Sequence, residues 1–195
     1  MNSVGKVVAA GEEVSQFKPE DVIFYADDLN RQGTNTEYQL VNERLVGNKP
    51  KSLPDTEATA LPLTTITAWE ILFEHLSIKQ QSLDSTDTFN EVILLVGTAG
   101  EVGYMLIQIT KLKMKSLSRH WEFMGESKFA RAMLKADDMN EQSRLLKRVS
   151  EWLDLGYIQT TAGANLGTIN ADNLKAAHET LESRHSIGKI VLDDF

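Results

Sequence analysis

The chain contains no cysteine, and this absence rules out several kinds of chemistry. Its 195 residues can form no disulfide, no catalytic thiolate and no thiolate zinc site. The lack of thiols is typical of a reducing compartment. Basic residues are also few: 20 stand against 28 acidic ones, and the formal net charge is −8. Because phosphate-driven binding of nucleic acid needs a basic face, we expect no nucleic-acid partner.

Long hydrophobic runs are missing as well. None reaches the ~20 residues that a helix needs to cross a bilayer. The beginning, "MNSVGKVVAAGEEV", lacks the charged-then-apolar layout of a secretion signal. We therefore expect a soluble, cytoplasmic protein with no membrane partner. With 42% hydrophobic and 25% charged residues, the composition is that of a globular chain that is long enough to bury a core.

The first third of the chain has the pattern of short strands separated by turns. Runs rich in β-branched and aromatic residues predict strands at 4–10, 21–26 and 36–41. Gly11, Pro19 and the "RQGTN" segment supply the turn residues between them. This spacing favours a small barrel or sandwich.

The hydrophobic period then becomes helical. It predicts helices over 67–78, from about Val102 to Leu112, from about Asp138 to Leu153, and after Asn170. Gly156 is expected to stop the third of these helices. A final strand is predicted at 187–192, and a buried parallel strand at 92–96, where "VILLV" is continuously apolar.

The segment "VGTAGEVG" places Gly97, Gly100 and Gly103 between that buried strand and a helix. Glycine permits the positive φ angles and the close backbone approach that a diphosphate requires, and the helix N-terminus offers free N–H groups. A nucleotide-binding turn is therefore predicted, with a ligand-free packing turn as the alternative. A Walker A loop is excluded, because no Lys-Ser or Lys-Thr pair follows. Glu101 is discordant, since it puts a carboxylate near the expected phosphates.

Other polar candidates are weaker. None of the four histidines has paired metal-ligand spacing, and we expect them to be solvated. The hydroxyls of Tyr25 and Tyr38 could donate a hydrogen bond or proton to a carbonyl substrate, but their predicted positions on strands favour packing. No Ser-His-Asp or paired-carboxylate arrangement stands out, so the catalytic residues are left unassigned.

Several stretches together resemble the medium-chain dehydrogenase/reductase superfamily, in its zinc-type alcohol dehydrogenase-like, quinone oxidoreductase branch. The stretch "GKVVAAGEEVSQFKPEDVIFYADDLNRQGTNTEYQLV" is similar to its GroES-like catalytic domain. "ILLVGTAGEVGYMLIQITKL" is similar to its glycine motif and following helix, and "NLKAAHETLESRHSIGKIVL" to its C-terminal part. These stretches stand in the family order.

The resemblance implies an α/β fold, made of a partial GroES-like β domain and an incomplete Rossmann-type nucleotide-binding domain. It implies a partial catalytic domain at 1–62, a shortened nucleotide-binding domain at 63–160, and a C-terminal helix and strand at 161–195. The implied activity is NADPH-dependent reduction of a quinone, enone or other carbonyl substrate, without zinc. The implied cofactor-binding residues are Thr67, Gly97, Ala99, Gly100, Val102, Gly103 and Lys189.

The chain departs from the family pattern in two places. The beginning of the GroES-like domain is absent, and after Leu112 the sequence joins directly to a segment that belongs later. A mononucleotide-binding half needs further strands, yet we find no buried strand run between Leu112 and Ile187. Glu122 has the spacing of a ribose ligand but no strand before it. The alternative is therefore an inactive shortened member that serves as a binding or assembly module or is a relic. Unpaired strand edges would favour a homo-oligomer.

Overall fold

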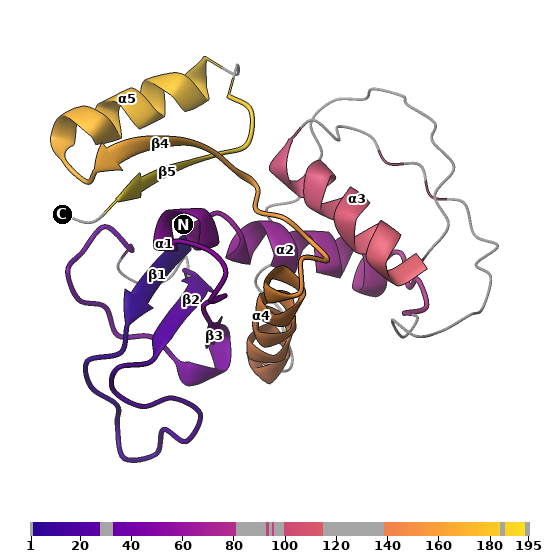
Figure 1. Cartoon of the computed structure of the whole chain (residues 1–195), viewed down its shortest axis with the longest axis horizontal. Coiled ribbons are helices and arrows are strands. Elements are labelled where there is room, and N and C mark those ends of the chain that lie inside the picture. The colour runs from indigo at the N-terminus through magenta and orange to yellow at the C-terminus, as the bar shows by residue number, and fades with distance from the viewer. Residues whose placement is uncertain are drawn as a thin grey trace.

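In the computed structural model, the described residues are 2–27, 33–80, 93, 95, 100–114, 139–183 and 186–193. They form, in chain order, β1 (Asn2–Lys6), β2 (Val22–Ala26), η1 (Glu43–Leu45), β3 (Val46–Asn48), α1 (Asp55–Thr59), α2 (Pro62–Trp69), η2 (Glu70–His75), α3 (Glu101–Met114), α4 (Met139–Asp154), β4 (Ala162–Thr168), α5 (Ala171–Glu182) and β5 (Lys189–Asp193). The sheet β1–β3 and the unit of β4, β5 and α5 lie on opposite sides of α1 and α2 (Figure 1).

The N-terminal sheet is antiparallel, with β2 between β1 and β3. The central position explains why four of the five β2 residues are buried, from Ile23 to Ala26. The strand predicted at 21–26 is confirmed, and the one predicted at 4–10 lies earlier, at Asn2–Lys6. The prediction of a strand at 36–41 is wrong: Tyr38 and Leu40 are 72% and 88% exposed there, and the third strand is β3.

Strand β3 is fixed by its contact with α4. A Cβ atom built on Gly47 would lie 2.5 Å from the Leu146 Cβ and 3.0 Å from the Leu146 carbonyl carbon. Only a glycine therefore permits this closeness of strand and helix. Leu146 itself is fully buried and belongs to the main core. Helix α4 thus holds the small sheet against the helical part of the molecule.

Helix α2 begins earlier than the predicted helix over 67–78, because Pro62 opens its first turn, a position that proline favours. It continues as a single π-helical segment, η2, whose end is closed by the Leu76 N–H donating to the Ile71 carbonyl, five residues back. Leu72 is fully buried, whereas Leu76 is 55% exposed. The change of helix type turns Leu76 away from the core, which helical periodicity alone did not predict.

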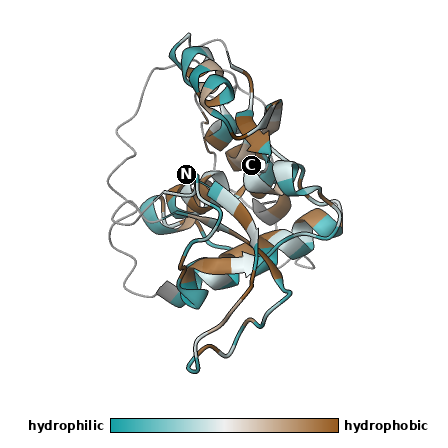
Figure 2. Ribbon diagram, turned by 90° about the vertical axis from the view of Figure 1, so that its left-hand side faces the viewer, coloured by the Kyte–Doolittle hydropathy of each residue, from teal (hydrophilic) through white to brown (hydrophobic). Residues whose placement is uncertain are grey.

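Helix α4 confirms its predicted hydrophobic face. The hydrophobic residues that recur at helical spacing are all buried: Leu145, Leu146, Val149, Trp152 and Leu153. The hydropathy colouring shows hydrophobic and hydrophilic residues on the same helices, as amphipathic packing requires (Figure 2). Gly156 has a φ of 72°, and the N–H groups of Gly156 and Tyr157 donate to the carbonyls of Leu153 and Trp152. This is a Schellman ending at the predicted residue. Asp138, the predicted start, lies outside the described residues.

The main core draws residues from most of the chain. Phe24 comes from β2, Leu61 and Leu72 from the region of α2 and η2, and Met105 and Ile109 from α3. Met105 and Ile109 are thus on the buried face of α3. Residues that precede position 62 in the sequence and residues that follow it both contribute to this core. The two parts of the chain therefore share one set of hydrophobic contacts.

The C-terminal unit contains a strand that the sequence analysis missed. Strand β4 pairs in parallel with β5, from Ala162 opposite Lys189 to Thr168 opposite Asp193. Helix α5 connects the two strands, and the Asn170 side chain caps it by accepting from the Asn173 N–H at 2.8 Å. The predicted helix after Asn170 and the final strand are thus confirmed, the strand beginning two residues later than predicted.

Among the residues that the structure describes, two carboxyl groups have shifted pKa values. At Asp154 burial would raise the pKa, but hydrogen bonds from Ser52 and Lys51 outweigh it and lower the pKa below its ordinary value; the Ser52 N–H donates at 2.8 Å. At Glu70 the pKa is raised, mainly by burial and further by the nearby Glu74 carboxylate.

No helix among the described residues is long and apolar enough to cross a membrane.

Candidate functional site

The N-terminal end of α3 is the part of the predicted glycine turn that the structure describes. Gly100 is exposed and directly precedes the helix, and its carbonyl accepts from the Tyr104 N–H at 2.9 Å. Val102 and Gly103 lie in the first turn, where backbone N–H groups have no acceptor within the helix itself. Gly97 and Ala99 lie outside the described residues. This end of α3 therefore carries the partial positive charge of a helix N-terminus.

The strand predicted at 92–96 is described only at Ile93 and Leu95, and neither residue lies in a strand. Both are partly buried and pack against the main core.

Among the described residues, the carboxylate of Glu101, the first residue of α3, has two polar partners. The Lys189 ammonium group lies 2.7 Å from the Glu101 Oε2, and the Thr64 hydroxyl lies 3.4 Å from the same oxygen. The side chains of Lys189 and Glu101 are 23% and 25% exposed. The three residues belong to β5, α3 and α2, so the cluster joins three elements that are far apart in the sequence.

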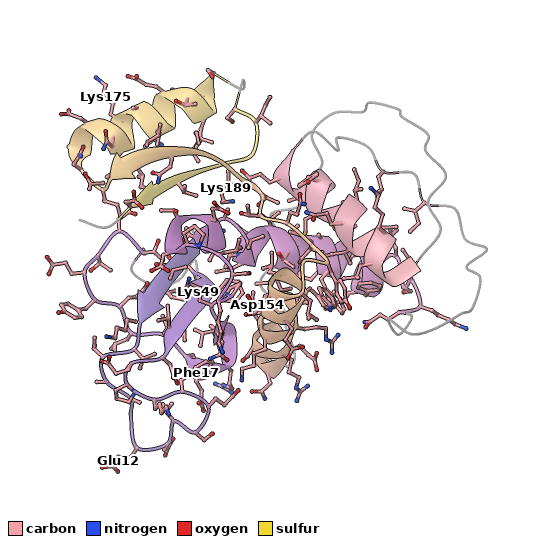
Figure 3. All side chains as sticks on the ribbon, in the orientation of Figure 1. Glu12, Phe17, Lys49, Asp154, Lys175 and Lys189 are labelled. Carbon is pink, nitrogen blue, oxygen red and sulfur yellow. The ribbon has the colours of Figure 1, made fainter. Side chains whose placement is uncertain are left out.

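The backbone around Lys189 is held in place by two glycines. Gly188 has a φ of 72°, and a Cβ atom on Gly163 would lie 2.0 Å from the Ile187 carbonyl oxygen. The Lys189 N–H donates to the Thr161 carbonyl at 2.8 Å. Because this close approach requires residues without side chains, the two glycines fix the position of the backbone where β5 begins. In Figure 3 Lys189 lies between the β4–β5 pair and helices α1 and α2.

Thr67 shares a face of α2 with Thr64, because it lies three residues further along the helix. Thr64 is fully buried, and its hydroxyl also lies 3.3 Å from the Ala60 carbonyl. Thr67 is half-buried. Thr67 thus lies on the same side of α2 as Thr64, whose hydroxyl contacts the Glu101 carboxylate.

This region has the donor types that suit a diphosphate: helix N–H groups and an ammonium group. Glu101 opposes that use, since its carboxylate already accepts from both Lys189 and Thr64. The adenosine end of a dinucleotide site cannot be built from the described residues, because Glu122 and the segment after α3 lie outside them. The residues present thus fit a diphosphate group in chemistry, with one competing carboxylate.

Tyr25 and Tyr38 occupy different environments. The Tyr25 hydroxyl donates to the Gln39 Oε1 at 2.6 Å, and the Gln39 amide donates to Asp27 at 2.9 Å. Burial raises the pKa of Tyr25. Tyr25 is therefore a packed, hydrogen-bonded residue, as expected, whereas Tyr38 is 72% exposed. His75 and His178 are exposed, and no group of three potential metal ligands occurs among residues that the structure describes.

Comparison with known proteins identifies the relatives of this chain. No family model matches it. A zinc-type alcohol dehydrogenase-like protein of Staphylococcus aureus (strain Mu50) is 26% identical over 98% of this chain and 81% of its own length. The mitochondrial NAD(P)H oxidoreductase RTN4IP1 of Homo sapiens is 35% identical over 55% of this chain and 26% of its length.

The solved structures give a stronger match. The crystal structure of a protein named as a zinc-dependent alcohol dehydrogenase, from Rhizobium etli CFN 42, has 30% sequence identity and a TM-score of 0.81, and the match covers all of this chain and 80% of that one. The fold and the relatives together define a dehydrogenase-type protein. The chain belongs to the medium-chain dehydrogenase/reductase superfamily.

The alignment also shows how the chain differs from its relatives. It spans 278 positions with the Staphylococcus aureus protein, whereas this chain has 195 residues, so at least 83 aligned positions of the relative face gaps. Segments inside the family pattern are therefore absent here. This agrees with the shortening that the sequence analysis inferred.

Proposed function

We propose that the chain is an NADPH-dependent oxidoreductase that reduces a quinone, an enone or another carbonyl compound, without a metal ion. The observation that carries the proposal is the match along the whole chain to an alcohol dehydrogenase structure at 30% identity. The name of the RTN4IP1 relative adds support for a nicotinamide cofactor. The proposal includes a cytoplasmic location. It also includes a division of the chain into a partial catalytic domain up to residue 62, a shortened nucleotide-binding domain up to residue 160 and a C-terminal helix and strand.

In this proposal each part of the site has a separate task. The first-turn N–H groups of α3, at Val102 and Gly103, bind the diphosphate, and Gly100 leaves room for it. Gly97 and Ala99 complete the turn by family resemblance. Lys189 supplies a positive charge, and Thr67 lies on the nicotinamide side. The bound cofactor supplies the hydride, while the protein supplies position and a water-poor environment.

A second candidate function is a binding or assembly module without redox activity. The gap of at least 83 aligned positions favours it. So does the sheet content: in the described part of the chain the only parallel pairing is that of β4 with β5, whereas a mononucleotide-binding half uses several parallel strands. Such a module would use its open strand edges to join a second copy of the chain.

Titration of NADPH into the purified full chain, followed by heat or fluorescence, tests the proposal. Saturable binding is expected, and no binding up to millimolar cofactor would refute it. Gly100→Asp is expected to abolish binding, because it adds a side chain and a negative charge where the diphosphate lies. Gly11→Asp is the matched control, since open space surrounds Gly11. Equal affinity in the Gly100 variant and the wild type would show that the turn has only a structural role.

A further inference from the structure

The ion pair between Glu101 and Lys189 gives the proposed cofactor site an internal competitor. We propose that the Glu101 carboxylate competes with the cofactor diphosphate for Lys189 and for the N-terminus of α3, and so sets how tightly the chain binds a dinucleotide. The inference rests on the proposed function. It assigns Glu101 a role as an affinity-determining residue.

The geometry supports competition rather than a surface contact. The Lys189 ammonium lies 2.7 Å from the Glu101 carboxylate, and each side chain is only about a quarter exposed. The Thr64 hydroxyl, itself buried, lies 3.4 Å from the same carboxylate oxygen. The close contact between the Gly163 and Gly188 backbones sets where the backbone of Lys189 lies.

The chemistry of the two anions is similar. A carboxylate in the first turn of a helix interacts favourably with the helix dipole, as a phosphate does. An ammonium group has three N–H donors, which can serve either anion. A diphosphate that binds beside an intact Glu101 carboxylate meets a like charge in a partly desolvated place, where repulsion is screened less than in water. Binding therefore requires Lys189 to exchange its carboxylate partner for a phosphate.

An ion pair elsewhere in the chain provides the contrast. Lys175 and Glu179 on α5 are 3.9 Å apart, and their side chains are 76% and 66% exposed. Lys175 lies on the outer side of α5, away from the N-terminus of α3 (Figure 3). Such a solvated pair contributes little to stability or binding. Removal of one partner there tests for a general effect of net charge.

The experiment is NADPH titration, by heat or fluorescence, into four full-length forms: wild type, Glu101→Gln, Lys189→Gln and Glu179→Gln. Gln keeps the length and hydrogen bonding of Glu101 but removes its charge. We expect about tenfold tighter binding in Glu101→Gln, equal to ~1.4 kcal/mol. Lys189→Gln should bind more weakly than the wild type, and Glu179→Gln should match it. Far-ultraviolet circular dichroism confirms that each variant is folded.

The double variant Glu101→Gln/Lys189→Gln shows whether the effect passes through Lys189. The gain from losing the carboxylate should shrink in the absence of the ammonium group, because the two residues are coupled. Wild-type binding with equal or weaker binding by Glu101→Gln would overturn the inference alone. Binding by Glu101→Gln where the wild type does not bind would support the competition by Glu101 but refute the proposed function for the wild-type chain. No binding by either form would overturn the proposed function and the inference with it.

Discussion

Gly47→Ala tests the contact that holds the N-terminal sheet against α4. The added Cβ would lie 2.5 Å from the Leu146 Cβ, 3.0 Å from the Leu146 carbonyl carbon and 3.1 Å from the Lys147 nitrogen. Two of these three atoms belong to the helix backbone, so the clash cannot be relieved by rotating a side chain. Either α4 or β3 must move.

Overpacking of this kind costs about 1–3 kcal/mol, and we expect the upper half of that range because backbone atoms are involved. For a chain of this size, 1 kcal/mol corresponds to about 2–4 °C in Tm, so Tm should fall by about 4–12 °C. Thermal unfolding followed by circular dichroism and urea denaturation measure the loss.

Gly11→Ala is the control, since a Cβ there meets no atom within 4 Å. Its Tm should stay close to that of the wild type. Leu146→Ala should not rescue Gly47→Ala, because the closest contact is with the Cβ that alanine keeps. Wild-type stability in Gly47→Ala would refute the close packing of β3 on α4.

Two pH-dependent predictions follow from the shifted carboxyl groups. The folded-state pKa of Asp154 is below its ordinary value of 3.8, so its charged form stabilises the fold above that pH. This stabilisation is lost as the pH falls through the folded-state pKa. In Asp154→Asn, the free energy of unfolding from urea denaturation should therefore decrease less as the pH is lowered. The folded-state pKa of Glu70 is above its ordinary value of 4.5, so folding favours its neutral form and this contribution is lost as the pH rises through the folded-state pKa. Glu70→Gln should therefore raise Tm at pH 7 but not at pH 4, and an equal gain at both pH values would contradict the shift.

The sequence predicted the long helices well because their signals are local. The hydrophobic stripe of α4, the glycine at its end and the Asn170 cap of α5 each follow from residues close together in the chain. The family resemblance was equally accessible, since the glycine motif and its flanks stand in the family order.

The short strands and the ion pair between Glu101 and Lys189 depend on contacts between residues that are far apart in the sequence. Strand β3 has three residues with a glycine at its centre, and its pairing with β2 and its close packing on α4 both involve residues far away in the chain. Strand β4 has no apolar run, so its pairing with β5 was not visible in the pattern. Glu101 was recognised as discordant, but its partner lies 88 residues later. Rules based on residue spacing apply only to residues close together in the sequence, so Lys189 could be proposed as a cofactor-binding residue only from the family resemblance.

Turnover is the most direct test of the proposed activity. The full chain is mixed with NADPH and, in separate reactions, with a quinone, an enone and a simple carbonyl compound, and loss of NADPH is followed by its absorbance. The proposal predicts protein-dependent, saturable oxidation of NADPH with at least one of these acceptors, faster than in Gly100→Asp. Saturable NADPH binding without oxidation in any of the three reactions would contradict it and favour the binding module.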